Sequence, residues 1–403
     1  RIMNGCPRVA ITGIGCICAP GRNLPECTDT LFAGRTKPLP PRGFRHGHSI
    51  SYPVFEVPED WIAPGSGTAG TSRTNRLVLA ASMEAMTNAE LDREILRSPR
   101  VGVCVGTTVG SAMNDEVFYR RYSEGEKPDM APITGFLNGN PAAAVARQFG
   151  LTGPCQTIVN ACSSGTDAIG VGALWIRSGL CDVVLAGGAD ELCHVSYNGF
   201  VSLMITDSSF CRPFDLHRRG LNLGEGAAML VLQAAPLRHG AARRPRAFVL
   251  GYGASCDAHH LTAPHPDGQG LRRAIGEALR TSGISSHDIS FVNAHGTGTK
   301  DNDRVESIVL SDMLPEVPFL STKGCTGHAL GAAGAIEAAF TVACLEEGRI
   351  PQSIGFESPD PDLPASPVRC ATTLKGTVAL SESLAFGGHN AALDGGHGLI
   401  AAA

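Results

Sequence analysis

Two stretches of this chain follow the same pattern: a short apolar strand, a polar turn containing glycine, and a helix made mostly of small residues. The first stretch covers residues 159–176 and the second covers residues 319–346. Helices rich in Gly and Ala can approach each other closely, because little side-chain volume separates their backbones. The pattern therefore predicts two central helices in close contact and an internal duplication, although residue identity between the halves is weak.

Strands and helices alternate in both halves. Apolar strands are expected over residues 8–15, 101–107, 181–190, 227–232, 247–254 and 289–294, and helices over residues 73–89, 141–149, 271–282 and 303–314. Apolar strands that alternate with helices are typical of α/β layers with a buried sheet. A connector at residues 236–246 predicts an N-terminal half, 1–245, and a C-terminal half, 246–403. Residues 192–210 are expected to be irregular, and residues 111–140 a polar insertion.

Composition excludes several classes of function. The net charge is −5 with no long basic run, which argues against a nucleic-acid partner. The longest apolar runs fall well short of the ~18 residues that suggest a membrane span, and no signal peptide is visible. The 14 cysteines include no Cys-x-x-Cys pair, which indicates free thiols in the reducing cytoplasm.

Cys162 is the candidate nucleophile. It lies between a β-prone segment, 155–159, and the first small-residue helix, so it falls at or just before a helix N-terminus. Unpaired N–H groups and the positive end of the helix dipole favour a thiolate there. A thiolate is a nucleophile, whereas a neutral thiol in a core is inert. A buried structural cysteine is the alternative interpretation.

Two histidines are candidates for the same site. His295 directly follows a strand in the turn 293–299, although a turn histidine bonded to the backbone is the alternative. His328 lies near the start of the second small-residue helix, where the dipole favours a neutral imidazole that can donate a hydrogen bond to an oxyanion. Lys323 precedes it, and Glu337 is a candidate ion-pair partner for this lysine.

A glycine turn near the end of the chain, residues 384–390, could form an oxyanion site from its backbone N–H groups. Phe386 in this turn could act as a movable plug, with Gly387 and Gly388 beside it. Residues 13–15 do not begin a dinucleotide-binding loop, because Cys18 stands at the third glycine of that motif.

A loose cluster of possible metal ligands lies at residues 256–265, and we predict no metal site there. It contains Cys256, His259, His260 and His265, but no paired carboxylate accompanies them. Prolines at 264 and 266 mark the segment as a loop.

Four separated blocks, at residues 161–165, 293–299, 321–337 and 386–390, resemble those of the β-ketoacyl-acyl carrier protein synthases, in the same order. Blocks at 212–215 and 224–226 agree, and the resemblance covers residues 9 to about 393. The Cys-His-His set matches the elongating members. The resemblance implies the thiolase-like fold, with two similar βαβ-type halves in a layered αβαβα arrangement.

The resemblance also implies a reaction, the decarboxylative Claisen condensation of an acyl group on Cys162 with malonyl-acyl carrier protein. The product is a β-ketoacyl-acyl carrier protein of fatty acid or polyketide elongation. No cofactor is implied, because the substrates are carried on the phosphopantetheine of acyl carrier protein. The expected assembly is a homodimer, or a heterodimer with a homologous subunit.

The resemblance assigns a role to each site residue. His295 and His328 would stabilise the enolate, and either could move a proton. Lys323 and Glu337 would support them, while the backbone N–H groups of Cys162 and Phe386 would form the oxyanion hole. The remaining roles are gating by Phe386, Gly387 and Gly388, and pantetheine binding by Thr297 and Thr299.

Several positions depart from the family pattern. Ala385 stands where glycine usually precedes the gating phenylalanine, His389 replaces a common threonine, and Leu221 replaces a frequent aromatic residue. Met204 lies where some fatty-acid synthases carry an arginine for carrier docking, which leaves Arg73 and Arg76 as candidates for that contact.

These departures, together with an expected break in the last strand at 394–398, favour a specialised polyketide or aryl-polyene pathway. The alternatives are acyl transfer without condensation and a non-catalytic partner of the chain-length-factor type.

Overall fold

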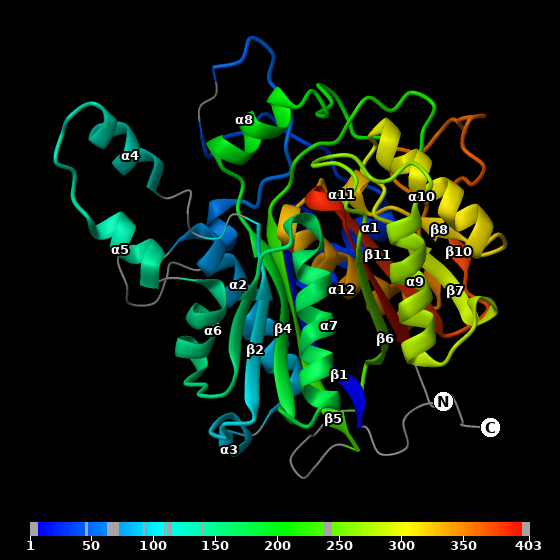
Figure 1. Ribbon diagram of the computed structural model, residues 1–403, viewed down its shortest axis with the longest axis horizontal. Helices are drawn as coiled ribbons and strands as arrows, with labels where there is room; N and C mark the ends of the chain where they lie inside the picture. The colour runs from blue at the N-terminus through cyan, green and yellow to red at the C-terminus, as the bar shows by residue number, and fades with distance from the viewer. Residues whose placement is uncertain are drawn as a thin grey trace.

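The computed structural model describes residues 7–44, 47–62, 72–91, 93–108, 110, 115–138, 140–236 and 244–396. Within these residues, ten strands join into one sheet in the order β3-β2-β4-β5-β1-β6-β12-β11-β7-β8 (Figure 1). The first five strands are β1 (Arg8–Cys18), β2 (Val101–Gly106), β3 (Cys155–Ile158), β4 (Val183–Asp190) and β5 (Gly226–Ala235). The other five are β6 (Ala247–Cys256), β7 (Ile289–Asn293), β8 (Phe319–Leu320), β11 (Val378–Ala385) and β12 (His389–Gly396). A separate pair contains β9 (Arg349–Ile350) and β10 (Thr372–Thr373).

The two halves of the sheet repeat one topology. From its outer edge inward, the first half reads β3-β2-β4-β5-β1 and the second reads β8-β7-β11-β12-β6. In each half three parallel strands are followed by two antiparallel pairings, and the strands occur in the same chain order. This correspondence confirms the expected duplication. We propose that the halves meet between residues 245 and 246, since β6 begins just after that point.

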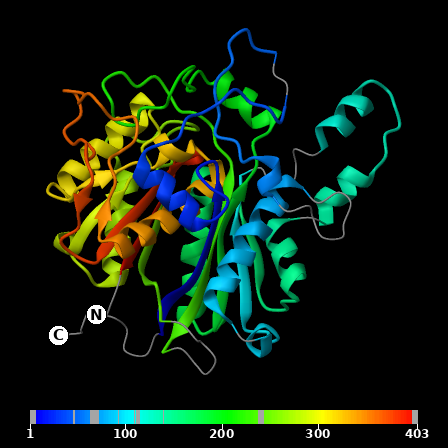
Figure 2. The same cartoon turned by 180° about the vertical axis from the view of Figure 1, so that it is seen from behind.

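Three layers of helices alternate with the two halves of the sheet (Figures 1 and 2). The central helices, α7 (Ser164–Arg177) and α12 (Ala333–Glu347), contact strands of both halves and each other. The outer helices α2 (Arg73–Ala89) and α6 (Pro141–Phe149) cover the first half. On the second half, α9 (Gln269–Ser282) packs on the strands and α10 (Lys300–Met313) contacts α9. The layered αβαβα arrangement of the thiolase-like fold is thus confirmed.

The central helices meet backbone to backbone at their N-terminal ends, as the small-residue pattern predicts. A Cβ atom on Gly165 would lie 2.8 Å from the carbonyl oxygen of Gly331 and 2.9 Å from the backbone nitrogen of Ala335. A Cβ atom on Gly334 would lie 2.0 Å from Oγ1 of Thr166. Such contacts are far inside van der Waals distance, so both positions require glycine.

The expectation of an irregular segment at 192–210 is wrong, because residues His194–Ser202 form helix α8. The helix is fixed by tertiary contacts that the local sequence does not reveal. Cys193 caps it by accepting a hydrogen bond from the backbone N–H of Ser196, and the buried Tyr197 hydroxyl bonds to the backbone of Tyr52.

The described part of the polar insertion at 111–140 includes two helices. It contains α4 (Glu116–Ser123) and α5 (Ala131–Asn138), which stand away from the layered body in both views (Figures 1 and 2). The remaining helices are α1 (Leu24–Ala33), α3 (Arg93–Leu96) and α11 (Lys323–Thr326). No helix among the described residues is both long and apolar enough to cross a membrane.

Within the expected break at 394–398, residues 394–396 of β12 stay paired with β11, although the register against β6 shifts between Asp394 and Gly395. Residues 397 and 398 lie outside the described residues. Asp394 lies buried in β12, where one carboxylate oxygen accepts a hydrogen bond from Ser282 Oγ at 3.0 Å. The other oxygen has no partner within the described part of the chain. Burial raises the pKa of Asp394 to about 7.

We expect Asp394→Asn to stabilise the protein at pH 8. The native state must carry a buried charge once the pH rises through about 7, whereas the unfolded carboxyl ionises near pH ~4. The asparagine removes that cost, so the gain in the free energy of unfolding should start to grow near pH ~4 and level off above pH 7, and it should be about 2.5 kcal/mol larger at pH 8 than at pH 5. Urea unfolding at pH 5 and pH 8 measures it, and equal gains at both values would contradict the pKa shift.

Candidate active site

A cavity of about 390 Å³ opens where the N-terminal ends of the two central helices meet. Cys162 reaches it from the first half of the chain, and His295 and His328 reach it from the second. The structure therefore brings together the three residues that the sequence offers as the catalytic set. Further residues that line the cavity include Phe200, Met204, Leu221, Thr297, Thr299 and Phe386.

The turn around Cys162 is held by a network centred on Asp167. One carboxylate oxygen of Asp167 accepts hydrogen bonds from Asn160 Nδ2 and Ser163 Oγ, both at 2.9 Å. The other accepts one from the Tyr252 hydroxyl at 2.8 Å. A one-turn 3-10 helix leads from here into α7, which places Cys162 just before the helix N-terminus as expected.

The thiol of Cys162 differs from the expectation of a thiolate favoured by the helix. Cys162 is only 3% exposed, and this burial raises the pKa of the thiol to about 12. The charge of Lys323 and a hydrogen bond from the backbone N–H of Phe386 both oppose the shift but do not cancel it. Desolvation of the sulfur outweighs the helix dipole, so the resting side chain is a neutral thiol.

We expect the rate at which iodoacetamide alkylates Cys162 to rise about tenfold per pH unit from pH 7 to pH 9. Only the thiolate reacts, and its fraction grows tenfold per unit below a raised pKa. Peptide-resolved mass spectrometry, with Cys162→Ala to identify the peptide, follows the reaction. A rate that levels off below pH 8 would show a thiolate already formed, contrary to the structure.

His295 is fixed by a buried lysine. Lys323 Nζ donates to His295 Nδ1 at 3.1 Å and to the His295 carbonyl oxygen at 2.5 Å, and it also forms an ion pair with Glu337. Lys323 is 1% exposed and Glu337 2% exposed. The structure thus brings together the lysine and the glutamate that the sequence suggests as partners.

Both imidazoles are held in one tautomer. His295 Nδ1 accepts from Lys323, and His328 Nδ1 accepts from the backbone N–H of Leu330 at 3.2 Å. Burial, reinforced by the charge of Lys323, places the pKa of each histidine well below its usual range, so both rings are neutral. A neutral ring whose Nδ1 accepts carries its proton on Nε2. The site therefore holds two N–H donors.

Acidic residues that the sequence analysis missed support the His295 turn. Asp303 accepts hydrogen bonds from the backbone N–H groups of Thr297 and Gly298 at 3.1 and 3.2 Å. Glu306 accepts one from Gly296 N–H at 2.7 Å. Their sequence signal is acidic residues in the first two turns of the helix that follows the loop, where carboxylates commonly bind nearby backbone N–H groups.

The glycine turn at 386–388 packs over Cys162. The backbone N–H of Phe386 points toward the cysteine sulfur, and the Phe386 ring stacks on Phe200 of α8 with centroids 5.4 Å apart. Gly387 and Gly388 have φ values of 83° and 80°, in the left-handed region that favours glycine. Sequence reasoning missed Phe200, because α8 itself was not expected.

The proposed pantetheine contacts, Thr297 and Thr299, line the cavity, with their hydroxyl oxygens 2.8 Å apart. Arg73 and Arg76 do not line it. Arg73 donates to Glu225 at 2.6 and 2.9 Å, and both arginines form ion pairs with Glu59.

The histidines of the rejected metal cluster instead stabilise turns. His260 Nδ1 accepts from the backbone N–H groups of Thr262 and Ala263, both at 3.1 Å, and His265 Nδ1 accepts from that of Asp267 at 3.2 Å.

A buried cysteine, two neutral imidazoles that donate, and a backbone N–H directed at the sulfur define an acyl-transferring enzyme that works through a thioester. Comparison with known proteins specifies the class. The family model of the β-ketoacyl synthase N-terminal domain matches residues 63–236, and that of the C-terminal domain matches residues 246–357. The chain belongs to the β-ketoacyl synthase family.

Individual relatives agree. The chain is 33% identical to 3-oxoacyl-acyl-carrier-protein synthase 2 of Synechocystis sp., covering 96% of this chain and 97% of that protein. It is 34% identical to a putative polyketide β-ketoacyl synthase 1 of Streptomyces cyaneus, with 96% and 97% covered.

Solved structures give the same result. The ishigamide ketosynthase/chain length factor has a TM-score of 0.91 and 32% identity, covering 98% of this chain and 100% of that chain. A ketosynthase in complex with its chain length factor, from Xenorhabdus doucetiae, has a TM-score of 0.81 and 31% identity, with 97% and 98% covered. The protein is thus a condensing acyltransferase that joins an acyl group to a malonyl unit on acyl carrier protein, with loss of carbon dioxide.

Proposed function

We propose that this protein is the catalytic ketosynthase of a specialised polyketide-type pathway, of which aryl-polyene synthesis is one example, and that it works beside a homologous chain-length-factor subunit. The observation that carries the proposal is a complete Cys-His-His set in a chain similar to a chain of solved ketosynthase/chain-length-factor complexes. A chain-length factor without catalysis would not need the nucleophile Cys162 or the paired donors His295 and His328.

In the first half-reaction, the sulfur of Cys162 attacks the acyl thioester delivered on the phosphopantetheine arm. The oxygen of the tetrahedral intermediate becomes negative and is stabilised by the backbone N–H groups of Cys162 and Phe386. The carbon–sulfur bond to pantetheine breaks, and the proton of the Cys162 thiol ends on the departing pantetheine sulfur. Phe386 must move to admit the arm, while Thr297 and Thr299 bind it.

In the second half-reaction, a malonyl thioester enters and loses carbon dioxide. The charge that develops on its thioester oxygen meets the Nε2–H donors of His295 and His328. Lys323 strengthens the first of these donors, because its ammonium bonds to the opposite ring nitrogen. The enolate carbon attacks the acyl carbon, and the Cys162 sulfur leaves as a thiolate, which takes up a proton from solvent water.

The proposal also includes the docking of acyl carrier protein and the cellular compartment of the enzyme. Acyl carrier protein would dock near Arg73 and Arg76, where an acidic carrier surface could replace Glu59, which is 64% exposed. Met204, 87% exposed on the rim of the cavity, offers no charge for that contact. Free thiols at every described cysteine support a cytoplasmic location.

The test is intact-mass analysis of the purified protein after incubation with a panel of acyl carrier proteins loaded with acetyl, aromatic or polyene acyl groups. Malonyl-carrier protein follows, with and without the homologous subunit. We expect acylation of this chain alone, and repeated extension only in the presence of the partner.

Each other outcome has a definite meaning. Acylation without loss of carbon dioxide would indicate an acyltransferase that does not condense. No acylation by any group would indicate a non-catalytic subunit. Full extension of saturated primers by this chain alone would favour ordinary fatty-acid elongation over the specialised pathway.

A further inference from the structure

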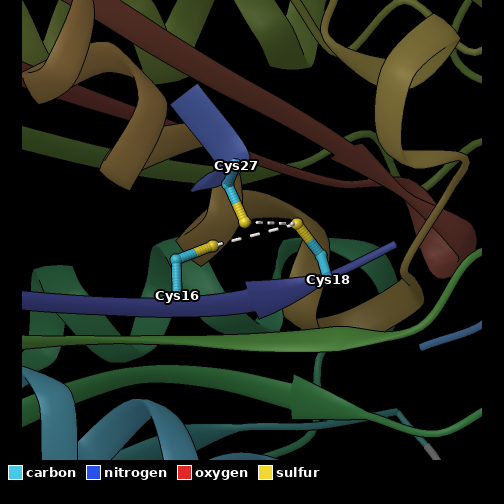
Figure 3. A group of neighbouring side chains, drawn as sticks. All are labelled: Cys16, Cys18 and Cys27. Carbon is cyan, nitrogen blue, oxygen red and sulfur yellow. Dashed lines mark hydrogen bonds between the residues drawn. The ribbon is translucent and has the colours of Figure 1, made fainter. Parts of the chain in front are cut away.

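Three cysteine sulfurs converge in the core, away from the cavity that holds Cys162. Cys16 and Cys18 lie on the same face of β1, two residues apart, and Cys27 reaches them from α1 (Figure 3). The Cys16–Cys18 sulfur distance is 3.9 Å and the Cys18–Cys27 distance is 3.5 Å. Within the described part of the chain, this is the one group of three potential metal ligands whose atoms all lie within 4.8 Å of one another.

These distances match the separation that a metal would require. A thiolate–metal bond of about 2.3 Å places the sulfurs of a trigonal site roughly 4.0 Å apart. The Cys16–Cys18 distance of 3.9 Å is close to that value, and the Cys18–Cys27 distance of 3.5 Å is shorter by roughly 0.5 Å. Because successive residues of a strand point to opposite faces, the two-residue spacing of Cys16 and Cys18 is fixed by β1 itself.

All three candidate ligand atoms are cysteine sulfurs. The nearby Glu84 carboxylate is occupied by the backbone N–H groups of Cys16 and Leu24, at 2.8 and 2.9 Å. All three cysteines are fully buried in an apolar cluster with Leu24 and Leu31. Soft thiolate ligands in a dry core select soft cations over Mg²⁺ or Ca²⁺. Among the described residues, no fourth ligand joins the three sulfurs, which disfavours Zn²⁺, because its structural sites are tetrahedral.

The Cys27 thiol donates a hydrogen bond to the carbonyl oxygen of Gly21 at 3.2 Å, which holds its sulfur beside the other two. Thiolate sulfur is a ligand that selects Cu⁺, and a metal that binds a cysteine displaces the proton of its thiol.

We propose that Cys16, Cys18 and Cys27 form a three-sulfur binding site for a thiophilic monovalent cation, with Cu⁺ as the cation that fits it. The site is separate from the condensation chemistry, because none of the three lines the catalytic cavity. Binding forms three sulfur–metal bonds without a change of oxidation state, and each of the three thiols gives its proton to the buffer as it binds.

The test is anaerobic titration of the reduced, full-length protein with Cu⁺ against a competing chelator. Iodoacetamide first blocks the exposed thiols Cys155, Cys256 and Cys370 in the native state, and mass spectrometry verifies that the buried group is untouched. We expect one equivalent of Cu⁺ to bind, and Cys18→Ala to weaken the affinity at least about a hundredfold. Cys344→Ala, which removes a buried cysteine of α12, should leave binding unchanged.

Two further measurements keep the proposal testable if Cys18→Ala folds poorly. X-ray absorption on the wild-type complex should show three sulfur neighbours at about 2.3 Å. Cys325→Ala should keep the affinity, because Cys325 is outside the three-sulfur group. Nitrogen or oxygen ligands, a fourth sulfur from Cys325, or wild-type binding no tighter than that of Cys18→Ala would each overturn it.

Discussion

Cys162→Ala is expected to abolish acyl transfer and to lower the rate of condensation by at least about four orders of magnitude. The residue supplies the attacking sulfur, and no other cysteine among the described residues lines the cavity. The substitution removes one buried atom, so the fold should remain intact. Intact mass after incubation with acyl-carrier protein measures the acylation, and product formation measures the condensation.

The same variant separates the two halves of the reaction. Loss of carbon dioxide from malonyl-carrier protein depends on the donors of His295 and His328, so Cys162→Ala should retain it within about tenfold. Cys104→Ala, which removes a buried cysteine of β2, is the matched control and should acylate normally. If decarboxylation also disappears in Cys162→Ala, the sulfur participates in a step that we assign to the histidines.

Lys323→Met should produce the second large effect, because it leaves Glu337 buried without its ion-pair partner. Breaking a buried pair on one side costs about 3–5 kcal/mol of stability. His295 also loses the group that fixes its tautomer, so decarboxylation should fall about 10²- to 10³-fold. Urea unfolding and release of carbon dioxide from malonyl-carrier protein measure the two effects separately.

A double substitution distinguishes structure from chemistry. Lys323→Met with Glu337→Leu replaces the buried pair by apolar side chains, which proteins often tolerate at little cost. We expect most of the stability to return while decarboxylation stays low. Recovery of both would mean that Lys323 acts only by holding the fold, and our assignment of its contact with His295 would be wrong.

The features of the fold that follow from local patterns were predictable from the sequence. Apolar strands, the α2 and α6 helices, and the runs of small residues in α7 and α12 are all visible among neighbouring residues. Helix α8 was not, because its stability depends on the distant backbone of Tyr52 and on an unusual cysteine cap at Cys193. A single sequence gives no measure of such contacts.

In the candidate site, too, some features were visible in the local sequence and others depend on the folded chain. Resemblance to a family gave the positions of the nucleophile and the histidines, since these lie in short ordered motifs. The protonation of Cys162 was misjudged, because desolvation depends on everything that surrounds the sulfur, whereas the helix end is visible locally. Asp303 and Glu306 were missed for a related reason, since their role is defined by a loop that they contact only in the folded chain.

The contact between Gly165 and Ala335 has a consequence for how this enzyme can diversify. Because α7 and α12 touch through their backbones there, their separation is fixed. The distance from Cys162 to the two histidines therefore cannot be changed by exchanging side chains. A variant with a different acyl preference must therefore change the walls, such as Phe200, Met204 or Leu221. Substrate range and reaction geometry consequently depend on different residues. The acyl preference can change during evolution while the catalytic geometry stays constant.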